Sequence, residues 1–156
     1  MPRKARLVLD NAYYHIITRG NQKQQVFKEH DDFYFYLGLL SKYKKRFDSR
    51  LYGYCLMNNH VHLLVESDML NKFMHGINLS YAQYFRYKYK SIGHFWQDRY
   101  KSFVVQRDNY ILDCISYIEY NPVRAKIVSS PQDYSWSSYR ARVLGKNDKL
   151  LDQLVL

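Results

Sequence analysis

Two apolar runs separated by only two asparagines constrain the fold of this chain more than any other feature. Leu51–Met57 and His60–Glu66 each have the length and apolar content of a strand, and Asn58–Asn59 lies between them. Asparagine tolerates the positive φ that a tight turn requires. The two runs therefore predict an antiparallel hairpin, and the rest of the chain must be arranged around it.

Strand and helix patterns flank this hairpin on both sides. Before it we expect a strand at Ala12–Arg19 and a helix at Asp31–Phe47, with Asp31 as the helix cap. After it the patterns predict three further elements: a helix at Asn71–Tyr89, a strand at Arg99–Gln106 and a helix at Asp108–Tyr120. We expect the last helix to end at Asn121–Pro122, because the residue before a proline avoids the α region.

The order of these elements predicts an α+β fold. The first six elements follow the ferredoxin-like split βαβ arrangement, with a central antiparallel sheet and helices mainly on one face. The seventh is an extra C-terminal helix. The sequence has no internal repeat and no Pro/Gly/Ser-rich linker, so we expect residues 1–156 to form a single domain. Its core would span about 10–128, and an extension of about 129–156, with Trp136 and Tyr139, would pack across that core or shield the site.

Charge and aromatic content favour a nucleic-acid partner. The formal net charge is +10, and 17 of the 156 residues are tyrosine. Positive charge attracts polyanions, and binding to phosphates releases condensed counterions. Flat rings can stack on unpaired bases at roughly 1–3 kcal/mol per base. This combination favours single-stranded or irregular nucleic acid over plain duplex, although most of the tyrosines are expected to fill the core.

Cysteine content and hydropathy predict a soluble, cytoplasmic protein. Cys55 and Cys114 are the only cysteines, and each lies in an apolar element, which is typical of buried thiols in a reducing compartment. No apolar segment follows the basic N-terminus, so we expect no signal peptide. No apolar run approaches the roughly eighteen residues of a membrane span, so we expect no membrane partner.

A pair of histidines in the second strand of the hairpin is a candidate metal site. Because side chains alternate along a strand, His60 and His62 share one face and Val61 points to the other. Two imidazoles in this arrangement can bind one metal ion. A His-x-His pattern in a strand is more often structural, so it needs further support.

The last helix supplies a second candidate. Ile111, Ile115 and Ile118 form its apolar stripe, and four-residue spacing puts Tyr117 and Asn121 on one face at the flank of that stripe. Tyr120 projects from the opposite side. We therefore expect Tyr117, and not Tyr120, to face the sheet. On geometry alone, Tyr117 could equally be an amphipathic boundary residue.

These segments together resemble a known family. The run M-N-N-H-V-H-L-L-V at 57–65 is similar to the histidine-hydrophobic-histidine (HUH) motif of single-tyrosine transposases, and 117–125 resembles the family's segment that carries the nucleophilic tyrosine. The resemblance covers nearly the whole chain and is nearest to the REP-associated tyrosine transposase branch. Four further segments carry it in the same order: 1–6, 14–21, 95–100 and 134–139.

The resemblance implies a role for each candidate residue. His60 and His62 would be metal ligands, Tyr117 the nucleophile, and Asn121 the polar side chain that completes the metal site. The metal would be Mg²⁺ or Mn²⁺. Many relatives have proline with asparagine or glutamate before the first histidine. This chain has Asn58–Asn59, a difference that we expect to make the turn less rigid.

The chemistry of tyrosine fits this role. A phenol ordinarily has a pKa near 10, so it is a weak nucleophile at neutral pH until it is ionised or positioned. A divalent ion would polarise the scissile phosphate and stabilise the leaving 3′ oxygen. Attack gives a 5′-phosphotyrosine and a free 3′-hydroxyl, and the exchanged bond can be re-formed elsewhere without ATP. The expected activity is therefore DNA cleavage and strand transfer by a transposase.

Basic residues supply candidate DNA contacts. One group forms an N-terminal arm, and the others flank the strands and helices nearest the site. As a group they should make binding fall steeply with salt. The candidates are Arg3, Lys4, Arg6, Arg19, Arg86, Lys88, Lys90, Arg99, Lys101 and Arg124. We interpret the four other histidines, His15, His30, His75 and His94, as structural or surface residues.

Two other functions are compatible with parts of the sequence. Ferredoxin-like sheets with exposed aromatics also act as non-catalytic modules that bind single-stranded nucleic acid, although the RRM signature is absent here. A metal-dependent phosphodiester hydrolase would activate water and would need carboxylates beside the histidines. Only Glu66 and Asp68 are near in sequence. The chain could act as a monomer, or as a homodimer that exchanges the tyrosine between subunits.

Overall fold

A four-stranded antiparallel sheet forms the centre of the molecule. The computed structural model describes residues 12–106 and 110–155. The strands lie in the order β2-β3-β1-β4, and every neighbouring pair is antiparallel. Their bounds are β1 (Tyr13–Arg19), β2 (Arg50–Leu56), β3 (His60–Glu66) and β4 (Lys101–Val105). This topology confirms the predicted α+β fold with a split βαβ arrangement.

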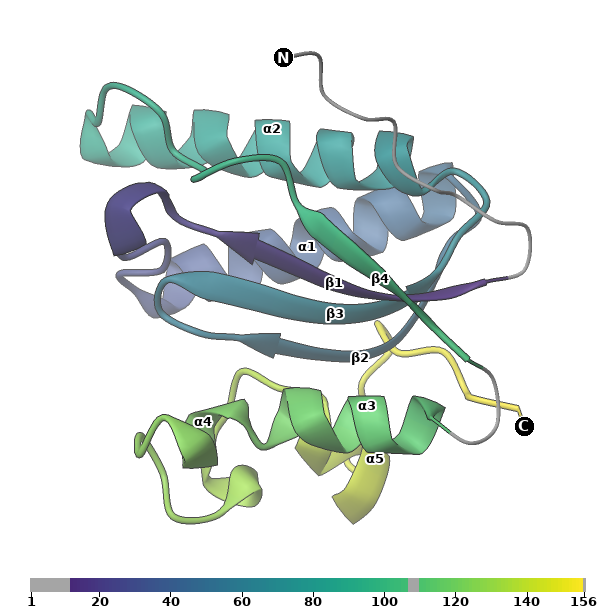
Figure 1. Ribbon diagram of the computed structural model, residues 1–156. Coiled ribbons are helices and arrows are strands. Elements are labelled where there is room, and N and C mark those ends of the chain that lie inside the picture. The colour runs from purple at the N-terminus through teal and green to yellow at the C-terminus, as the bar shows by residue number, and fades with distance from the viewer. Residues whose placement is uncertain (1–11, 107–109, 156) are drawn as a thin grey trace.

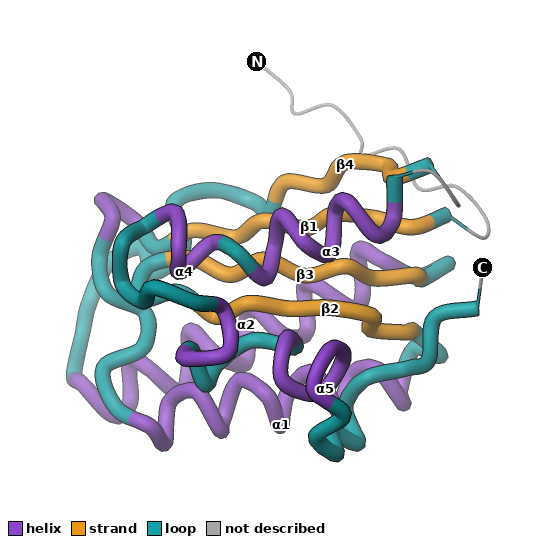
Figure 2. The backbone as a smooth tube through the Cα atoms, turned by 90° about the horizontal axis from the view of Figure 1, so that it is seen from below, coloured by secondary structure: helices purple, strands orange, loops and turns teal. Residues whose placement is uncertain are grey.

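Helices cover both faces of this sheet. The long helices α1 (His30–Arg46) and α2 (Leu70–Tyr89) pack on one face (Figure 1). The other face carries α3 (Ile111–Glu119), which crosses β2 and β3, and Figure 2 shows α3 in front of the sheet from below. The shorter helices are α4 (Asn121–Arg124) and α5 (Tyr139–Leu144), with 3-10 turns at Asn21–Lys23 and Pro131–Asp133. Along the described stretches, no helix combines the length and the apolar composition that a bilayer crossing requires.

Alternation along β3 divides its side chains between two cores. Val61, Leu63 and Val65 belong to the larger core, which lies between the sheet and α1–α2. Leu64 belongs to the smaller core beneath α3, where it packs near the apolar stripe Ile111, Ile115 and Ile118. His60 and His62 have the same parity as Leu64 and therefore face α3.

Two helix ends differ from the sequence prediction. The N-cap of α1 is Glu29, not Asp31: the Asp32 carboxylate accepts the backbone N–H of Glu29 in a capping box. The last helix ends at Glu119, and Pro122 lies in the first turn of a second helix, α4, where its missing N–H leaves no intrahelical bond unmade. The predicted start of this helix at Asp108 lies outside the described residues.

The turn between β2 and β3 is tied to the segment that follows β1. The Asn58 carbonyl accepts the backbone N–H groups of Val26 and Phe27, and the Asn59 carbonyl accepts that of Gly20 at 2.9 Å. His60 is therefore placed by a turn with several backbone attachments, not by a free hairpin tip.

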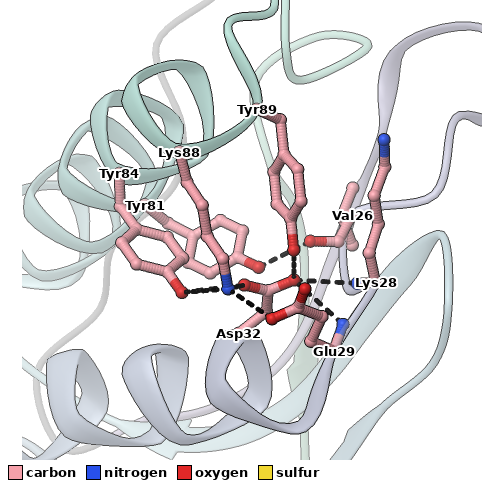
Figure 3. A network of polar contacts seen from close by, with 8 residues as sticks. All are labelled: Val26, Lys28, Glu29, Asp32, Tyr81, Tyr84, Lys88 and Tyr89. Atoms are coloured by element: carbon pink, nitrogen blue, oxygen red, sulfur yellow. Dashed lines mark hydrogen bonds and ion pairs between the residues drawn. The ribbon is translucent and has the colours of Figure 1, made fainter.

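A network around Asp32 joins α1 to α2. The buried Asp32 carboxylate accepts hydrogen bonds from Tyr84 and Tyr89 and forms an ion pair with Lys88 (Nζ to Oδ1, 2.8 Å). Figure 3 shows these three side chains reaching from α2 to Asp32 and Glu29 of the α1 cap. The hydrogen bonds lower the pKa of Asp32 to about 2, against the opposing effect of its burial. The two helices are thus fixed to each other by charge as well as by apolar packing.

Candidate metal and nucleophile site

The two histidines of the HUH motif lie side by side on the face of β3 that α3 covers. Their ring centroids are 4.9 Å apart and their planes differ by 77°. The His62 ring is buried and the His60 ring is partly buried. The alternation of β3 thus brings both imidazoles to one point beneath the helix.

Each of these imidazoles has a hydrogen-bond partner at Nδ1. His60 Nδ1 lies 2.7 Å from Oδ1 of Asn59, and His62 Nδ1 lies 2.9 Å from Nε2 of His15. Because the Asn59 oxygen can only accept, His60 must carry its proton on Nδ1, which leaves a lone pair on Nε2. Histidine ligands of metals are commonly oriented by such bonds on the other ring nitrogen.

Burial keeps both histidines neutral. Loss of solvation, aided by the positive charge of Arg19, lowers the pKa of His60 to about 4. Loss of solvation is the main cause that lowers the pKa of His62 to about 2, and the neighbouring His60 and His15 lower it further. A neutral imidazole is the form that binds a metal ion, so both rings are ready to bind one at neutral pH.

Tyr117 faces this pair, whereas Tyr120 does not. The Tyr117 ring centroid lies 6.4 Å from that of His62 and 6.0 Å from that of His15, with edge-on geometry in both contacts. Its side chain is 52% exposed, so a substrate can reach it. The Tyr120 ring instead packs edge-on against Tyr139. The two tyrosines therefore have different surroundings, although only three residues separate them.

Asn121 supplies a third polar group one turn after Tyr117. Its amide Nδ2 is buried and has no hydrogen-bond partner. In residues 12–106 and 110–155, no group of three or more His, Cys, Asp or Glu side chains is arranged to hold a metal ion. A third protein ligand beside His60 and His62 would have to be of another type, and a side-chain amide oxygen such as that of Asn121 is one; the unpartnered Nδ2 is a hydrogen-bond donor and does not bind a cation.

Three of the basic residues predicted to bind DNA lie on the histidine face. The Arg124 guanidinium lies 4.0 Å from the Tyr117 ring centroid, and its Nη2 donates to the Tyr117 carbonyl. The charge of Arg19 contributes to the lowered pKa values of both histidines. Lys101 of β4 is exposed and lies opposite Ile17 of β1, which in turn lies opposite His62 of β3. Residues directly opposite each other point to the same face of a sheet, so Lys101 shares the face of His62. The structure thus brings these three charges to the site.

The other basic candidates lie elsewhere. Arg86, Lys88 and Lys90 are at the end of α2, on the far side of the sheet, where Lys88 pairs with Asp32 and Glu29 (Figure 3). Arg99 lines a pocket of about 790 Å³ between α2 and the segment before β4. Arg3, Lys4 and Arg6 lie outside the described residues.

His15 is the site residue that the sequence did not reveal. It stands in β1 beside Leu64 of β3, diagonal to His62, and its ring stacks on that of His62 at 5.2 Å. Sequence spacing cannot show this contact, because it depends on the register between two strands 47 residues apart. The one available clue was parity: His15 and Arg19 lie on the same face of the first strand.

Comparisons with known proteins show the family and the fold of this chain. A family model described as "Transposase IS200 like" matches residues 8–121. A solved REP-associated tyrosine transposase bound to a REP hairpin aligns over 100% of both chains, with a TM-score of 0.78 and 13% identity. A putative transposase from Deinococcus radiodurans aligns over 76% of this chain and 96% of its own, with a TM-score of 0.52 and 19% identity. No curated protein gives a significant match.

Proposed function

Because the chain belongs to the IS200-like transposase family, we propose that it cleaves and rejoins single-stranded DNA through a 5′-phosphotyrosine formed by Tyr117. The whole chain would act as one transposase domain. The observation that carries this proposal is the edge-on placement of a half-exposed phenol over the pair His15–His62, of which His62 is buried and His15 is partly buried. A tyrosine that served only to pack would not need a neutral imidazole pair beside it.

The covalent step exchanges one phosphodiester for another. The Tyr117 oxygen attacks the phosphorus of the scissile phosphodiester. A bond forms between this oxygen and phosphorus, which stays attached to the 5′ oxygen of the downstream nucleotide, and the bond between phosphorus and the 3′ oxygen breaks. The phenol loses its proton and the 3′ oxygen leaves as a hydroxyl. No bond energy is lost to hydrolysis, so the 3′-hydroxyl of another end can attack the phosphotyrosine and complete the transfer.

His60, His62 and Asn121 would hold the divalent ion, Mg²⁺ or Mn²⁺, through the two Nε2 atoms and the amide. When bound, such an ion supplies positive charge to the phosphate and to the departing oxygen. Asn59 and His15 keep the imidazoles oriented for this task. Arg124, at 4.0 Å from the Tyr117 ring, and Arg19 add fixed positive charge that stabilises the phosphate as the reaction proceeds.

For the substrate we propose single-stranded DNA that carries a hairpin. The support is the net charge of +10, the basic residues beside the site, and a relative of the same fold that binds a REP hairpin. The hydrolase alternative needs a carboxylate beside the histidines. Glu66 lies at the opposite end of β3, where it accepts a hydrogen bond from Tyr52, so we prefer the tyrosine mechanism.

A denaturing gel tests this proposal. Wild type, Tyr117→Phe and Tyr120→Phe are incubated with end-labelled hairpin DNA and Mn²⁺. We expect a covalent protein–DNA band with wild type and Tyr120→Phe, and none with Tyr117→Phe. Cleavage by Tyr117→Phe without an adduct would support the hydrolase. Binding by all three proteins without cleavage, across a panel of hairpins, would support the non-catalytic module.

A further inference from the structure

A fully buried carboxylate lies on the helix that carries Tyr117. Glu119 is two residues from Tyr117 and two from Asn121, and its side chain has no solvent exposure. Burying an ionised carboxylate without partners is strongly unfavourable. The partners of Glu119 therefore show which segments hold α3 in place.

Those partners come from the C-terminal extension. Arg142 of α5 binds the carboxylate through two nitrogens, with Nη2 at 2.6 Å from Oε1 and Nε at 3.0 Å from Oε2. The Ser138 hydroxyl donates to Oε2 at 2.6 Å. This bidentate arrangement with a third hydrogen bond is among the stronger contacts that a carboxylate can make. We call Glu119, Ser138 and Arg142 the latch.

The latch is also attached to the sheet. Ser138 Oγ accepts the backbone N–H of Tyr54 at 3.0 Å, and the Ser138 N–H donates to the Tyr54 carbonyl at 3.0 Å. Next to it, Ser137 forms an antiparallel bridge with Cys55 of β2. One end of the latch is therefore fixed to β2 and the other to α3.

The helix needs such an attachment. α3 has nine residues, and isolated helices of fewer than about 12 to 15 residues are marginal in water, so tertiary contacts must hold it. Apart from the latch, its buried side chains are the three isoleucines Ile111, Ile115 and Ile118. Apolar contacts of this kind hold the helix against the sheet but are not directional, so they resist sliding along the sheet less well. A bidentate ion pair is directional and fixes where the helix lies on the sheet.

We propose that the latch holds α3 on the sheet of its own chain, so that Tyr117 serves the histidine pair of the same molecule. This inference rests on the proposed function for its catalytic meaning, but its structural part does not. Glu119, Ser138 and Arg142 are positioning residues: they touch no reacting atom and act through the placement of Tyr117 and Asn121. Without the latch, α3 would leave the sheet while the α1–α2 core stays folded.

Amide hydrogen exchange tests the structural part without DNA. Arg142→Ala removes the cation from a buried carboxylate, and Arg140→Ala removes a cation of the same helix that bonds only residues 132 and 135. In Arg142→Ala we expect exchange in 111–119 to accelerate on the order of 100-fold, with α1 and α2 unchanged. Arg140→Ala should match wild type. Uniform acceleration through α1, α2 and α3, or no change in α3, would overturn the proposal.

Should Arg142→Ala fail to fold, Ser138→Ala and Arg142→Lys give weaker versions of the same measurement. Each keeps part of the contact, so acceleration confined to 111–119 is still expected. The single variant Arg142→Lys should accelerate exchange in 111–119 less than the double variant Ser138→Ala/Arg142→Lys does. A response that spreads equally to the larger core in these variants would again contradict the latch.

Adduct formation tests the catalytic part. A Tyr117→Phe chain is mixed with a His60→Ala/His62→Ala chain, so that only exchange of α3 between molecules restores a site. With the latch intact we expect no adduct, and an adduct would overturn the proposal. In otherwise wild-type protein, Arg142→Ala should slow adduct formation at least tenfold, and Arg140→Ala should not. Absence of adduct with wild type itself would count against the proposed function, and the exchange data would still decide the latch.

Discussion

The two faces of the sheet are built for different purposes. The α1–α2 face buries twenty-four side chains in one cluster, and the charged Asp32 at its border accepts bonds from two tyrosines, a lysine and two backbone N–H groups. Among the described residues, the α3 face buries nine apolar side chains in one cluster, and the amide nitrogen of Asn121 has no hydrogen-bond partner there. On the α1–α2 side the buried Tyr36 hydroxyl and Asn78 Oδ1 are likewise without a partner.

The two faces differ in the size of their cores and in access: the α3 face has the smaller core and carries the half-exposed phenol of Tyr117 beside the histidines. One strand, β3, serves both faces, because its odd-numbered residues enter the large core and its even-numbered ones include the histidines. The rigid core therefore positions the site directly, without an intervening loop.

Asp32→Ala should have the largest effect on stability. It removes the acceptor of the network in Figure 3: Tyr84 and Tyr89 lose their partner, and Lys88 loses one of its two ion pairs and keeps that with Glu29. We expect the free energy of unfolding to fall by roughly 3–5 kcal/mol, measured by urea denaturation. The exposed neighbour Asp31→Ala should change it by less than about 0.5 kcal/mol. Equal effects from both would show that the two faces do not differ as described.

Acid should weaken the histidine face first. Folded His60 and His62 have pKa values of about 4 and about 2, below the usual 6.5, so the unfolded chain binds more protons as pH falls below 6.5. Stability should therefore fall by about 2 kcal/mol per histidine between pH 7 and pH 5. The contribution of Asp32, whose pKa is about 2 and normally 3.8, is lost only below pH 3.8.

Urea denaturation at pH 7 and pH 5 measures this loss. The variant His62→Gln keeps a polar side chain but cannot titrate, so its stability should depend less on pH than that of wild type. An unchanged pH dependence would mean that the proton uptake belongs to other groups.

His15→Phe should have the smallest effect on stability and a selective one on the metal. It removes the partner of His62 Nδ1 and keeps a ring of similar size. We expect about tenfold weaker Mn²⁺ binding by calorimetric titration, with little change in melting temperature. His75→Phe, on the exposed side of α2, serves as the control. Unaltered Mn²⁺ affinity in His15→Phe would remove His15 from the site.

The sequence predicted those features that depend on local spacing. The Asn58–Asn59 hairpin and the parity of His60 and His62 follow from strand patterns, and the structure has both. The different ring neighbours of Tyr117 and Tyr120 do not follow from the helix period, because residues three apart share a side of a helix; they arise because α3 ends at Glu119 and Tyr120 packs against Tyr139. The order of the elements predicted the fold, which the superposition confirms, and the family resemblance predicted the transposase family, which the family model confirms.

What the sequence could not predict depends on contacts between distant segments. The pairing of His15 with His62 requires the register of two strands, and that of Glu119 with Arg142 requires the path of the extension across β2. Lys88 could not be separated from the other lysines predicted to bind DNA, because its partner Asp32 is 56 residues away. The α1 cap was misplaced because Asp32 accepts the N–H groups of both Lys28 and Glu29.

The segment paired with β2 also determines how copies of this protein can associate. Residues 136–138 and the Asp152 backbone use the outer hydrogen-bonding groups of β2 at Leu51, Tyr54 and Leu56. That margin is closed to strand addition from another chain. Within the described residues, the opposite margin, β4, has no strand beyond it, and Phe103 and Val104 are about half exposed there. Of the two outer strands formed by the described residues, β4 is therefore the one with hydrogen-bonding groups left for another strand.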